Sequence, residues 1–406
     1  MSVELETKAL STDIRFGYRR PRLLFVIGED WFFYSHFIDR ARAAFENGFD
    51  VYVATRINES DKKYGLNNIK IIPINIRRTS INPLHFIADA REIYQVISYV
   101  KPDIVHNIAL KPIVLGSLGA VLHQVPAIVN SPVGMGFVFS SQTIKARILR
   151  PIISLLLWRS MRGKGKTVIV ENVDDARELA VRGAIDRSKI KVIEGAGLDI
   201  DEYPFFARET SRPRVMLAAR MLREKGVYDF ISAATILRSR KVKCDFVLVG
   251  KPDDLNPGSV PLSDLNSWKE SGLVEWRGHS DTMPTTIREA DIFCLPSYRE
   301  GFPKVLIEAM ASGAAVVATD VPGCRQAVQH METGLLVPKQ NPEALSEAIE
   351  MLVNDVSLRQ RLAERARQRV EKELTKETIG MQTLKVYNRV LKRSSGNPPG
   401  INRVQK

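Results

Sequence analysis

Short apolar runs alternate with helix-length segments along most of this chain, and that alternation most constrains its fold. Runs that are apolar without polar interruption are typical of parallel strands buried on both faces. The first series of expected strands covers 23–27, 51–54, 69–74, 103–106, 127–130, 167–170 and 191–193, and the second covers 215–219, 245–250, 291–296, 314–319 and 334–338. The sequence therefore predicts an α/β protein with two Rossmann-like, doubly wound sheets.

The length of 406 residues suits two domains or more. Segment 201–214 carries two prolines and mixed charge between the two series, which is typical of a linker. We therefore expect an N-terminal domain over 20–204 and a C-terminal domain over 205–375.

The end of the chain divides into two parts. Ile379, Leu384, Tyr387 and Leu391 approximate an apolar stripe at helical spacing, which predicts a docked helix over 376–391. The remaining segment 392–406 is basic and rich in Gly, Pro and Ser, so we expect a disordered tail.

Composition argues against a disulfide-rich, secreted or membrane-spanning protein, and the net charge indicates the kind of partner. Lys plus Arg number 59 against 46 Asp plus Glu, and the net charge of +13 suits an anionic partner such as nucleic acid, acidic lipid or phosphate. The three cysteines are widely spaced, which indicates neither a disulfide framework nor a metal site and favours a reducing cytosol. No apolar run approaches the length of about 18 residues that spans a membrane, and no signal peptide is recognisable. We expect a cytoplasmic protein.

Residues 298–313, YREGFPKVLIEAMASG, carry the most informative motif. An expected strand ends just before it, and KVLIEAMAS then has the pattern of a helix that stops at Gly313. A helix N-terminus at the carboxyl end of a parallel strand offers free N–H groups to phosphate. Glu300 lies in the loop and Glu308 inside the helix. Two ordinary surface glutamates would be the simplest interpretation, but Glu308 is flanked by apolar residues and needs a hydroxyl or cationic partner.

A second motif, AARMLREKG, follows the first expected strand of the second series. Arg220 supplies a fork of donors suited to phosphate, and Lys225 supplies a compact positive charge. Taken alone, this stretch favours a solvated basic loop. At the carboxyl end of a strand the two cations are also placed to hold a diphosphate.

Together the two motifs resemble the family 4 glycosyltransferases, retaining sugar-nucleotide enzymes of the GT-B fold. The resemblance covers roughly residues 20 to 390, with Glu300 and Glu308 matching the E-x7-E signature. It implies two domains facing a cleft, an acceptor site in the first, and a last helix that crosses back to it. It also implies that Arg220 and Lys225 hold the donor diphosphate, Glu308 the ribose, and Glu300 the sugar. The full implied donor-binding set is Arg220, Lys225, Glu300, Gly301, Phe302, Pro303, Lys304 and Glu308.

The resemblance also implies a mechanism without a metal or other cofactor. Negative charge grows on the departing diphosphate, and Arg220, Lys225 and the helix N-terminus are suited to stabilise it. The triplet Asp199-Ile-Asp201 looks like a metal-binding DxD. It lacks a second acidic cluster, so we interpret it as structural.

Three positions depart from the family pattern. A bulky turn with His36 replaces the Gly-rich loop after the first strand, Ile108 stands where many relatives carry a His, and Gln326 stands where they often carry Glu. The usual catalytic His is therefore unassigned. The candidates for catalysis are His106, Lys111, His36 and Glu300. A lone His at a strand end is more often structural.

A basic segment precedes the sixth expected strand. Residues 144–166 hold seven Lys or Arg and no acid around the apolar run IISLLLW, which favours either a core helix with basic ends or an amphipathic helix on an anionic membrane. The preceding GMGFVF turn resembles that of relatives acting on polyprenyl-diphosphate-linked sugars. The candidate residues for membrane or acceptor contact are Arg147, Arg150, Arg159 and Arg162.

The sequence as a whole favours an enzyme over a binding protein. We expect a retaining glycosyltransferase that moves a hexosyl or N-acetylhexosaminyl group from a nucleotide sugar, with UDP favoured, to a lipid-linked saccharide in surface polysaccharide or lipopolysaccharide synthesis. The expected location is the cytoplasm, peripheral on the cytoplasmic face of the inner membrane. The alternatives are a GT-B epimerase or hydrolase and, from another class, a basic nucleic-acid-binding protein. The last needs interleaved aromatic and basic residues that we do not find, so no nucleic-acid partner is expected.

Overall fold

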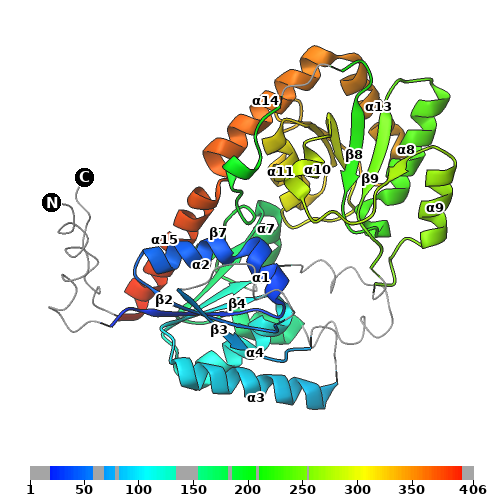
Figure 1. Cartoon of the computed structure of the whole chain (residues 1–406). Helices are drawn as coiled ribbons and strands as arrows, with labels where there is room; N and C mark the ends of the chain where they lie inside the picture. Colours follow the sequence, from blue (N-terminus) through cyan, green and yellow to red (C-terminus); the bar gives the residue numbers. More distant parts are fainter. Residues whose placement is uncertain are drawn as a thin grey trace, which may run out of the picture.

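The computed structural model describes residues 19–57, 68–77, 82–133, 154–181, 185–206, 210–253 and 256–395. These residues form two parallel sheets, each covered by helices on both faces (Figure 1). Both sheets share the strand order of a doubly wound fold, in which the order reverses beside the first strand. The predicted fold class is confirmed.

The N-terminal sheet has the order β3-β2-β1-β4-β5-β6-β7. Its strands are β1 (Arg22–Val26), β2 (Asp50–Thr55), β3 (Ile69–Pro73), β4 (Ile104–Ile108), β5 (Ala127–Ser131), β6 (Lys166–Val170) and β7 (Ile190–Val192). Its helices are α1 (Asp30–His36), α2 (Ile38–Glu46), α3 (Pro83–Val100), α4 (Leu110–Leu122) and α7 (Val173–Val181), with a further helical segment at 154–161. All seven strands expected from the first series are present.

The C-terminal sheet has the order β10-β9-β8-β11-β12-β13. Its strands are β8 (Arg214–Ala218), β9 (Asp245–Val249), β10 (Glu275–Trp276), β11 (Ile292–Leu295), β12 (Ala315–Thr319) and β13 (Leu335–Val337). Its helices are α8 (Val227–Ser239), α9 (Leu262–Glu270), α10 (Met283–Ile287), α11 (Lys304–Ser312), α12 (Pro322–Ala327), α13 (Pro342–Asn354) and α14 (Val356–Glu373). The two-residue strand β10 escaped the sequence analysis because it is too short to form an apolar run. The expected division at 204–205 falls between the two sheets.

The last helix, α15 (Lys376–Ser395), leaves the C-terminal domain and packs on α2 of the N-terminal domain (Figure 1). Three of the four residues of the expected stripe are buried there, with Ile379 and Tyr387 fully enclosed, and Leu391 is partly buried. Gly380 allows the close approach, because a Cβ at that position would lie 3.0 Å from the Cβ of Ala43. The expected end at 391 is wrong by four residues, since nothing in the sequence interrupts a helix before Gly396. The rest of the expected tail lies outside the described residues.

Backbone hydrogen bonds fix the point where the chain crosses between domains. The N–H of Leu198 donates to the carbonyl of Leu374 at 2.9 Å, and the N–H of Lys376 donates to the carbonyl of Leu198 at 2.9 Å. Gly197 lies beside this crossing with a φ of +79°, and a Cβ there would lie 2.8 Å from the Cα of Lys376. The crossing therefore needs glycine at 197 for both conformation and space.

Tyr387 joins α15 to the interior of the N-terminal domain. Its hydroxyl lies 2.7 Å from Nδ1 of His106, and Nε2 of His106 lies 2.7 Å from Oγ of Ser131. All three side chains are buried, so each hydrogen bond replaces one that water would otherwise supply.

The Tyr387→Phe variant tests this connection. Removing the hydroxyl leaves a buried ring nitrogen of His106 without its partner, which costs about 1–3 kcal/mol of unfolding free energy. Urea denaturation should therefore show a lower midpoint than in the unaltered protein. Tyr99→Phe is the control because Tyr99 is 78% exposed. Equal midpoints for the two variants would contradict the role of Tyr387.

Candidate active site

The two sequence motifs meet at the carboxyl ends of β8 and β11. Nζ of Lys225 lies 2.6 Å from Oε1 of Glu300, and both side chains are mostly buried. Gly226 makes this possible with a φ of +71° and no side chain, since a Cβ there would lie 2.0 Å from the carbonyl oxygen of Pro296. The structure therefore brings together a cation and a carboxylate that are 75 residues apart.

Arg220 belongs to the same loop but has a different partner. Its Nη1 donates to Oδ2 of Asp253 at 2.7 Å, and its side chain is half exposed. An exposed ion pair contributes little to stability, so Arg220 can exchange this partner for a phosphate at small cost.

Glu308 is buried on α11, behind the helix N-terminus. Its Oε1 accepts a hydrogen bond from the hydroxyl of Tyr203 at 2.9 Å and lies 3.8 Å from Nζ of Lys304. Burial raises the pKa of Glu308, which Lys304 and Tyr203 partly oppose. The expectation that this carboxylate needs a hydroxyl or cationic partner is met by both kinds. Tyr203 was missed because it lies in the expected linker.

Lys304 also reaches the other domain. Its Nζ donates to the carbonyl of Ser35 at 3.2 Å, next to His36 at the end of α1. Burial and the charges of Lys304 and Arg40 lower the pKa of His36 to about 3. Of the two candidate histidines, His36 is the one beside the E-x7-E helix, and it is neutral at physiological pH.

The other two candidates in the N-terminal domain lie in structural roles. His106 is 1% exposed and hydrogen-bonded through both ring nitrogens, and burial lowers its pKa to about 3. Lys111 pairs with Asp89 at 2.5 Å and donates to the carbonyl of Arg77 at 2.9 Å. The structure contradicts catalysis by His106 because no substrate can reach its buried ring. The ammonium group of Lys111 is already paired with Asp89 of α3.

Two residues that the sequence analysis missed face the motif loop from the N-terminal domain. Nδ2 of Asn172 donates to the carbonyl of Gly301 at 2.9 Å. A Cβ on Gly301 would lie 2.7 Å from Oε2 of Glu171, so that carboxylate touches the loop directly. Burial raises the pKa of Glu171 to about 7, opposed by Arg40 and assisted by Asp175 and Glu300. An acidic residue just after the strand at 167–170 was the signal available in the sequence.

Gln326 joins the two domains where relatives often carry Glu. Its Nε2 donates to Oε1 of Glu194 at 2.5 Å, and its Oε1 accepts from the N–H of Val173 at 3.2 Å. A carboxylate at this position has no hydrogen to donate, so it would repel Glu194. The departure from the family pattern therefore has a structural reason.

Asp199 of the Asp199-Ile-Asp201 triplet has a structural role. Asp199 pairs with Lys376 at the start of α15 and accepts from the N–H of Asp201 at 3.3 Å. The carboxylate of Asp199 therefore stabilises the point where the chain crosses between the domains.

Arg159 and Arg162 are exposed at the end of the helical segment 154–161, together with Leu155 and Leu156. Arg147 and Arg150 lie outside the described residues. Among the helices that the structure describes, none combines the length and the apolar character needed to cross a bilayer.

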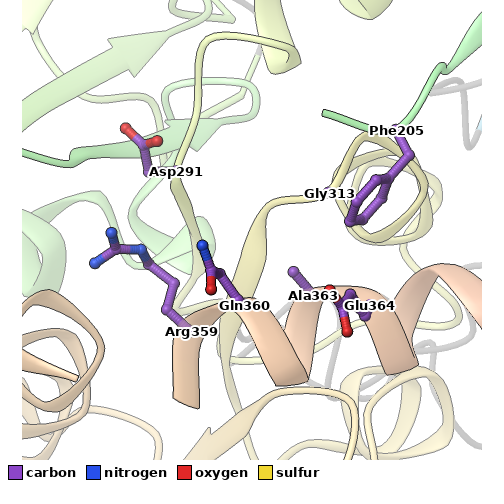
Figure 2. Close-up of a pocket in the computed structure, with 7 residues that line it drawn as sticks. All are labelled: Phe205, Asp291, Gly313, Arg359, Gln360, Ala363 and Glu364. Atoms are coloured by element: carbon purple, nitrogen blue, oxygen red, sulfur yellow. The ribbon is translucent and has the colours of Figure 1, made fainter. Parts of the chain in front are cut away.

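A separate cavity lies near the amino ends of β11 and β12, at the opposite end of the strands from the two motifs (Figure 2). Asp291 and Arg359 line it beside α14, with Phe205 and Gly313 on the other side. Arg359 donates to the carbonyls of Leu352 at 2.8 Å and Thr210 at 3.5 Å. Arg359 thus connects α14 to residues on either side of the cavity, and none of the lining residues belongs to the two motifs except Gly313 at the end of α11.

Comparisons with known proteins address the family. The model of glycosyl transferases group 1 matches residues 199–369, and the glycosyl transferase 4-like model matches residues 22–162. The N,N'-diacetylbacillosaminyl-diphospho-undecaprenol alpha-1,3-N-acetylgalactosaminyltransferase of Campylobacter jejuni is 30% identical over 358 residues, which cover 84% of this chain and 92% of the relative. This chain belongs to the family 4 glycosyltransferases. The predicted family is confirmed.

Two further proteins are similar to this glycosyltransferase, one in sequence and one in structure. The UDP-Gal:alpha-D-GlcNAc-diphosphoundecaprenol alpha-1,3-galactosyltransferase of Escherichia coli is 23% identical and covers 65% of this chain and 69% of its own. The crystal structure of Anabaena Alr3699/HepE in complex with UDP superposes with a TM-score of 0.73 at 16% identity, covering 91% of this chain and all of the other. The second similarity supports the GT-B fold.

Gly323 of this glycosyltransferase positions the motif loop, and Gly323→Ala tests it. A Cβ there would lie 2.4 Å from the carbonyl oxygen of Gly301 and 2.7 Å from that of Glu300, so the loop must shift. We expect at least tenfold weaker binding of UDP, the nucleotide that the sequence analysis favours, by calorimetry, with an unchanged circular dichroism spectrum. Gly28→Ala is the control because nothing lies within 4 Å of its added Cβ. Equal affinities in the two variants would contradict the role of Gly323.

Proposed function

We propose that this glycosyltransferase moves a hexosyl or N-acetylhexosaminyl group from a UDP-sugar to a saccharide carried by a polyprenyl diphosphate, in assembly of a surface polysaccharide. The observation that carries the proposal is the pairing of Lys225 with Glu300 beside the N-terminus of α11. The names of the Campylobacter jejuni and Escherichia coli relatives support a diphosphoundecaprenol-linked acceptor, and the UDP complex of a structural relative supports the nucleotide.

The diphosphate would bind among Lys225, Arg220 and the first turn of α11. Pro303 precedes α11. The first N–H groups of a helix have no partner within that helix, so those of α11 can bind phosphate. Two cations and a helix dipole offset the charge of a departing nucleoside diphosphate, so we propose transfer without a metal ion.

The ribose would bind at Glu308. A carboxylate accepts hydrogen bonds from two neighbouring hydroxyl groups, and burial strengthens those bonds. Lys304 and Tyr203 hold the carboxylate in position before the donor arrives. The donor sugar would then lie over the loop from Glu300 to Pro303. In our proposal the acceptor hydroxyl attacks from the face that the diphosphate leaves, which retains the anomeric configuration.

We propose a peripheral location on the cytoplasmic face of the inner membrane. Exposed apolar side chains of the N-terminal domain support contact with a membrane. Helices α3 and α4 pack side by side and expose large apolar side chains. The exposed residues are Leu84, Ile87, Tyr94 and Tyr99 on α3 and Leu118, Val121 and Leu122 on α4. The helical segment 154–161 packs against α4 and adds Leu155, Leu156 and Arg159. Apolar side chains with adjacent cations are typical of binding to an anionic bilayer surface.

The double variant Arg220→Ala, Lys225→Ala tests the donor site. Charge on the leaving group grows in the transition state, so the rate of transfer should fall 100-fold or more while UDP-sugar binding weakens by less than tenfold. EDTA should leave the rate of the unaltered protein unchanged. The measurement is transfer of radiolabelled sugar from UDP-sugars to undecaprenyl-diphosphate-linked saccharide, with free sugar quantified in parallel.

A matched control removes two exposed cations of the same domain, Lys243→Ala with Lys269→Ala, and should transfer normally. Equal losses in rate and binding in the Arg220, Lys225 variant would contradict leaving-group stabilisation. Release of free sugar without transfer, by the unaltered protein, would identify a hydrolase instead.

Neutralisation of Arg147, Arg150, Arg159 and Arg162 to Gln tests the membrane location. Each basic residue near an anionic surface contributes about 1 kcal/mol, so binding to vesicles of phosphatidylcholine and phosphatidylglycerol should fall at least tenfold in sedimentation. The control neutralises Arg238, Lys241, Lys243 and Lys269 in the C-terminal domain. Equal retention of both variants on the vesicles would contradict docking through this segment.

A further inference from the structure

A cavity between the domains opens at the carboxyl end of the N-terminal sheet, against the motif loop. Phe37, Arg40, Ser131, Glu171 and Asp175 line it from the N-terminal domain, and Gly301 lines it from the C-terminal domain. It is therefore placed where an acceptor bound to the first domain would meet a donor sugar bound over Gly301.

Two charged side chains in this cavity have unused hydrogen-bonding capacity. Arg40 is 4% exposed, and its Nε has no hydrogen-bond partner among the described residues. Within the described part of the chain, no side chain donates a hydrogen bond to the carboxylate of Glu171 or forms an ion pair with it. Glu300 and Glu308, by contrast, are engaged by Lys225 and by Tyr203 with Lys304. The Asp175 carboxylate, which also lines the cavity, accepts a hydrogen bond from Asn172. Among the described residues, Glu171 is thus the carboxylate lining this cavity that is available to a substrate hydroxyl.

The charges around Glu171 suit it to accept a proton. Burial raises its pKa to about 7, with Arg40 on α2 opposing the rise and Asp175 on α7 and Glu300 in the motif loop adding to it. A general base is most effective when its pKa lies near the working pH. Arg40 keeps a substantial fraction of the carboxylate ionised at that pH.

The catalytic candidates that the sequence analysis placed in the N-terminal domain are less suitable as proton acceptors. Ile108 occupies the position where many relatives carry His, and His106 is sealed in the interior. His36 is flanked by Lys304 and Arg40, whose charges disfavour its protonation. Lys111 is paired with Asp89.

We infer that Glu171 is the general base that takes the proton from the attacking hydroxyl of the acceptor. The hydroxyl oxygen forms the new bond to the anomeric carbon while the bond from that carbon to the diphosphate breaks. The hydroxyl proton passes to the Glu171 carboxylate, and the bonding pair leaves with the nucleoside diphosphate. Water removes the proton from Glu171 after the products depart. This inference rests on the proposed function.

The test compares Glu171→Gln with the unaltered protein in the transfer assay from pH 5.5 to 8.5. The unaltered protein should lose rate as the pH falls through about 7, because Glu171 becomes protonated and can no longer accept a proton. The variant should transfer 100-fold to 10,000-fold more slowly, without this acidic limb, while its UDP affinity by calorimetry stays unchanged. Sodium formate should partly restore transfer by Glu171→Ala, because it supplies a carboxylate to the vacated space.

Glu178→Gln is the matched control, since it removes the same charge from α7 outside the cavity and should keep both rate and pH profile. Transfer by Glu171→Gln within threefold of the unaltered rate would overturn the inference while leaving the proposed function in place. A slow Glu171→Gln that keeps the acidic limb, with no formate rescue in Glu171→Ala, would also overturn it, in favour of a positioning role. No transfer by the unaltered protein at any pH would overturn the proposed function and this inference together.

Discussion

The hydrogen bonds between Leu198 and residues 374 and 376 hold the two domains in one relative orientation, and the site depends on that orientation. Three further hydrogen bonds cross the same interface. Asn172 donates to Gly301, Gln326 donates to Glu194, and Lys304 donates to Ser35. Each contact joins a segment that follows a strand of one sheet to the opposite domain. The motif loop is therefore held from both sides, and the active site belongs to neither domain alone.

Three carboxylates within this interface have different surroundings and hence different uses. Glu300 is paired with Lys225 beside the proposed diphosphate site. Glu308 is buried but supported by Tyr203 and Lys304, which suits a fixed acceptor of hydrogen bonds. Glu171 has no such partner in the described residues and has a pKa of about 7, which suits proton transfer. The environment, and not the residue type, distinguishes the three.

Much of the fold could be predicted from the sequence, because parallel strands that are buried on both faces have uninterrupted apolar sequences. The E-x7-E pair and the Arg220, Lys225 pair could be placed as well, since each follows a recognisable strand and opens a helix or turn. The catalytic candidates in the N-terminal domain were predicted poorly. His106 stands at the end of a strand in the sequence, but α15 arrives from the far end of the chain and covers it with Tyr387.

The sequence by itself determined the two doubly wound sheets, the family and the donor-site motifs, because these depend on local periodicity and spacing. The tertiary structure decided which side chains face the cleft. Burial of His106, pairing of Lys111 with Asp89 and contact of Glu171 with Gly301 all arise between residues distant in the chain. The charges around a carboxylate and its exposure to solvent decide whether it acts as a base or as a fixed acceptor of hydrogen bonds. In this protein the packing of the two domains determines both.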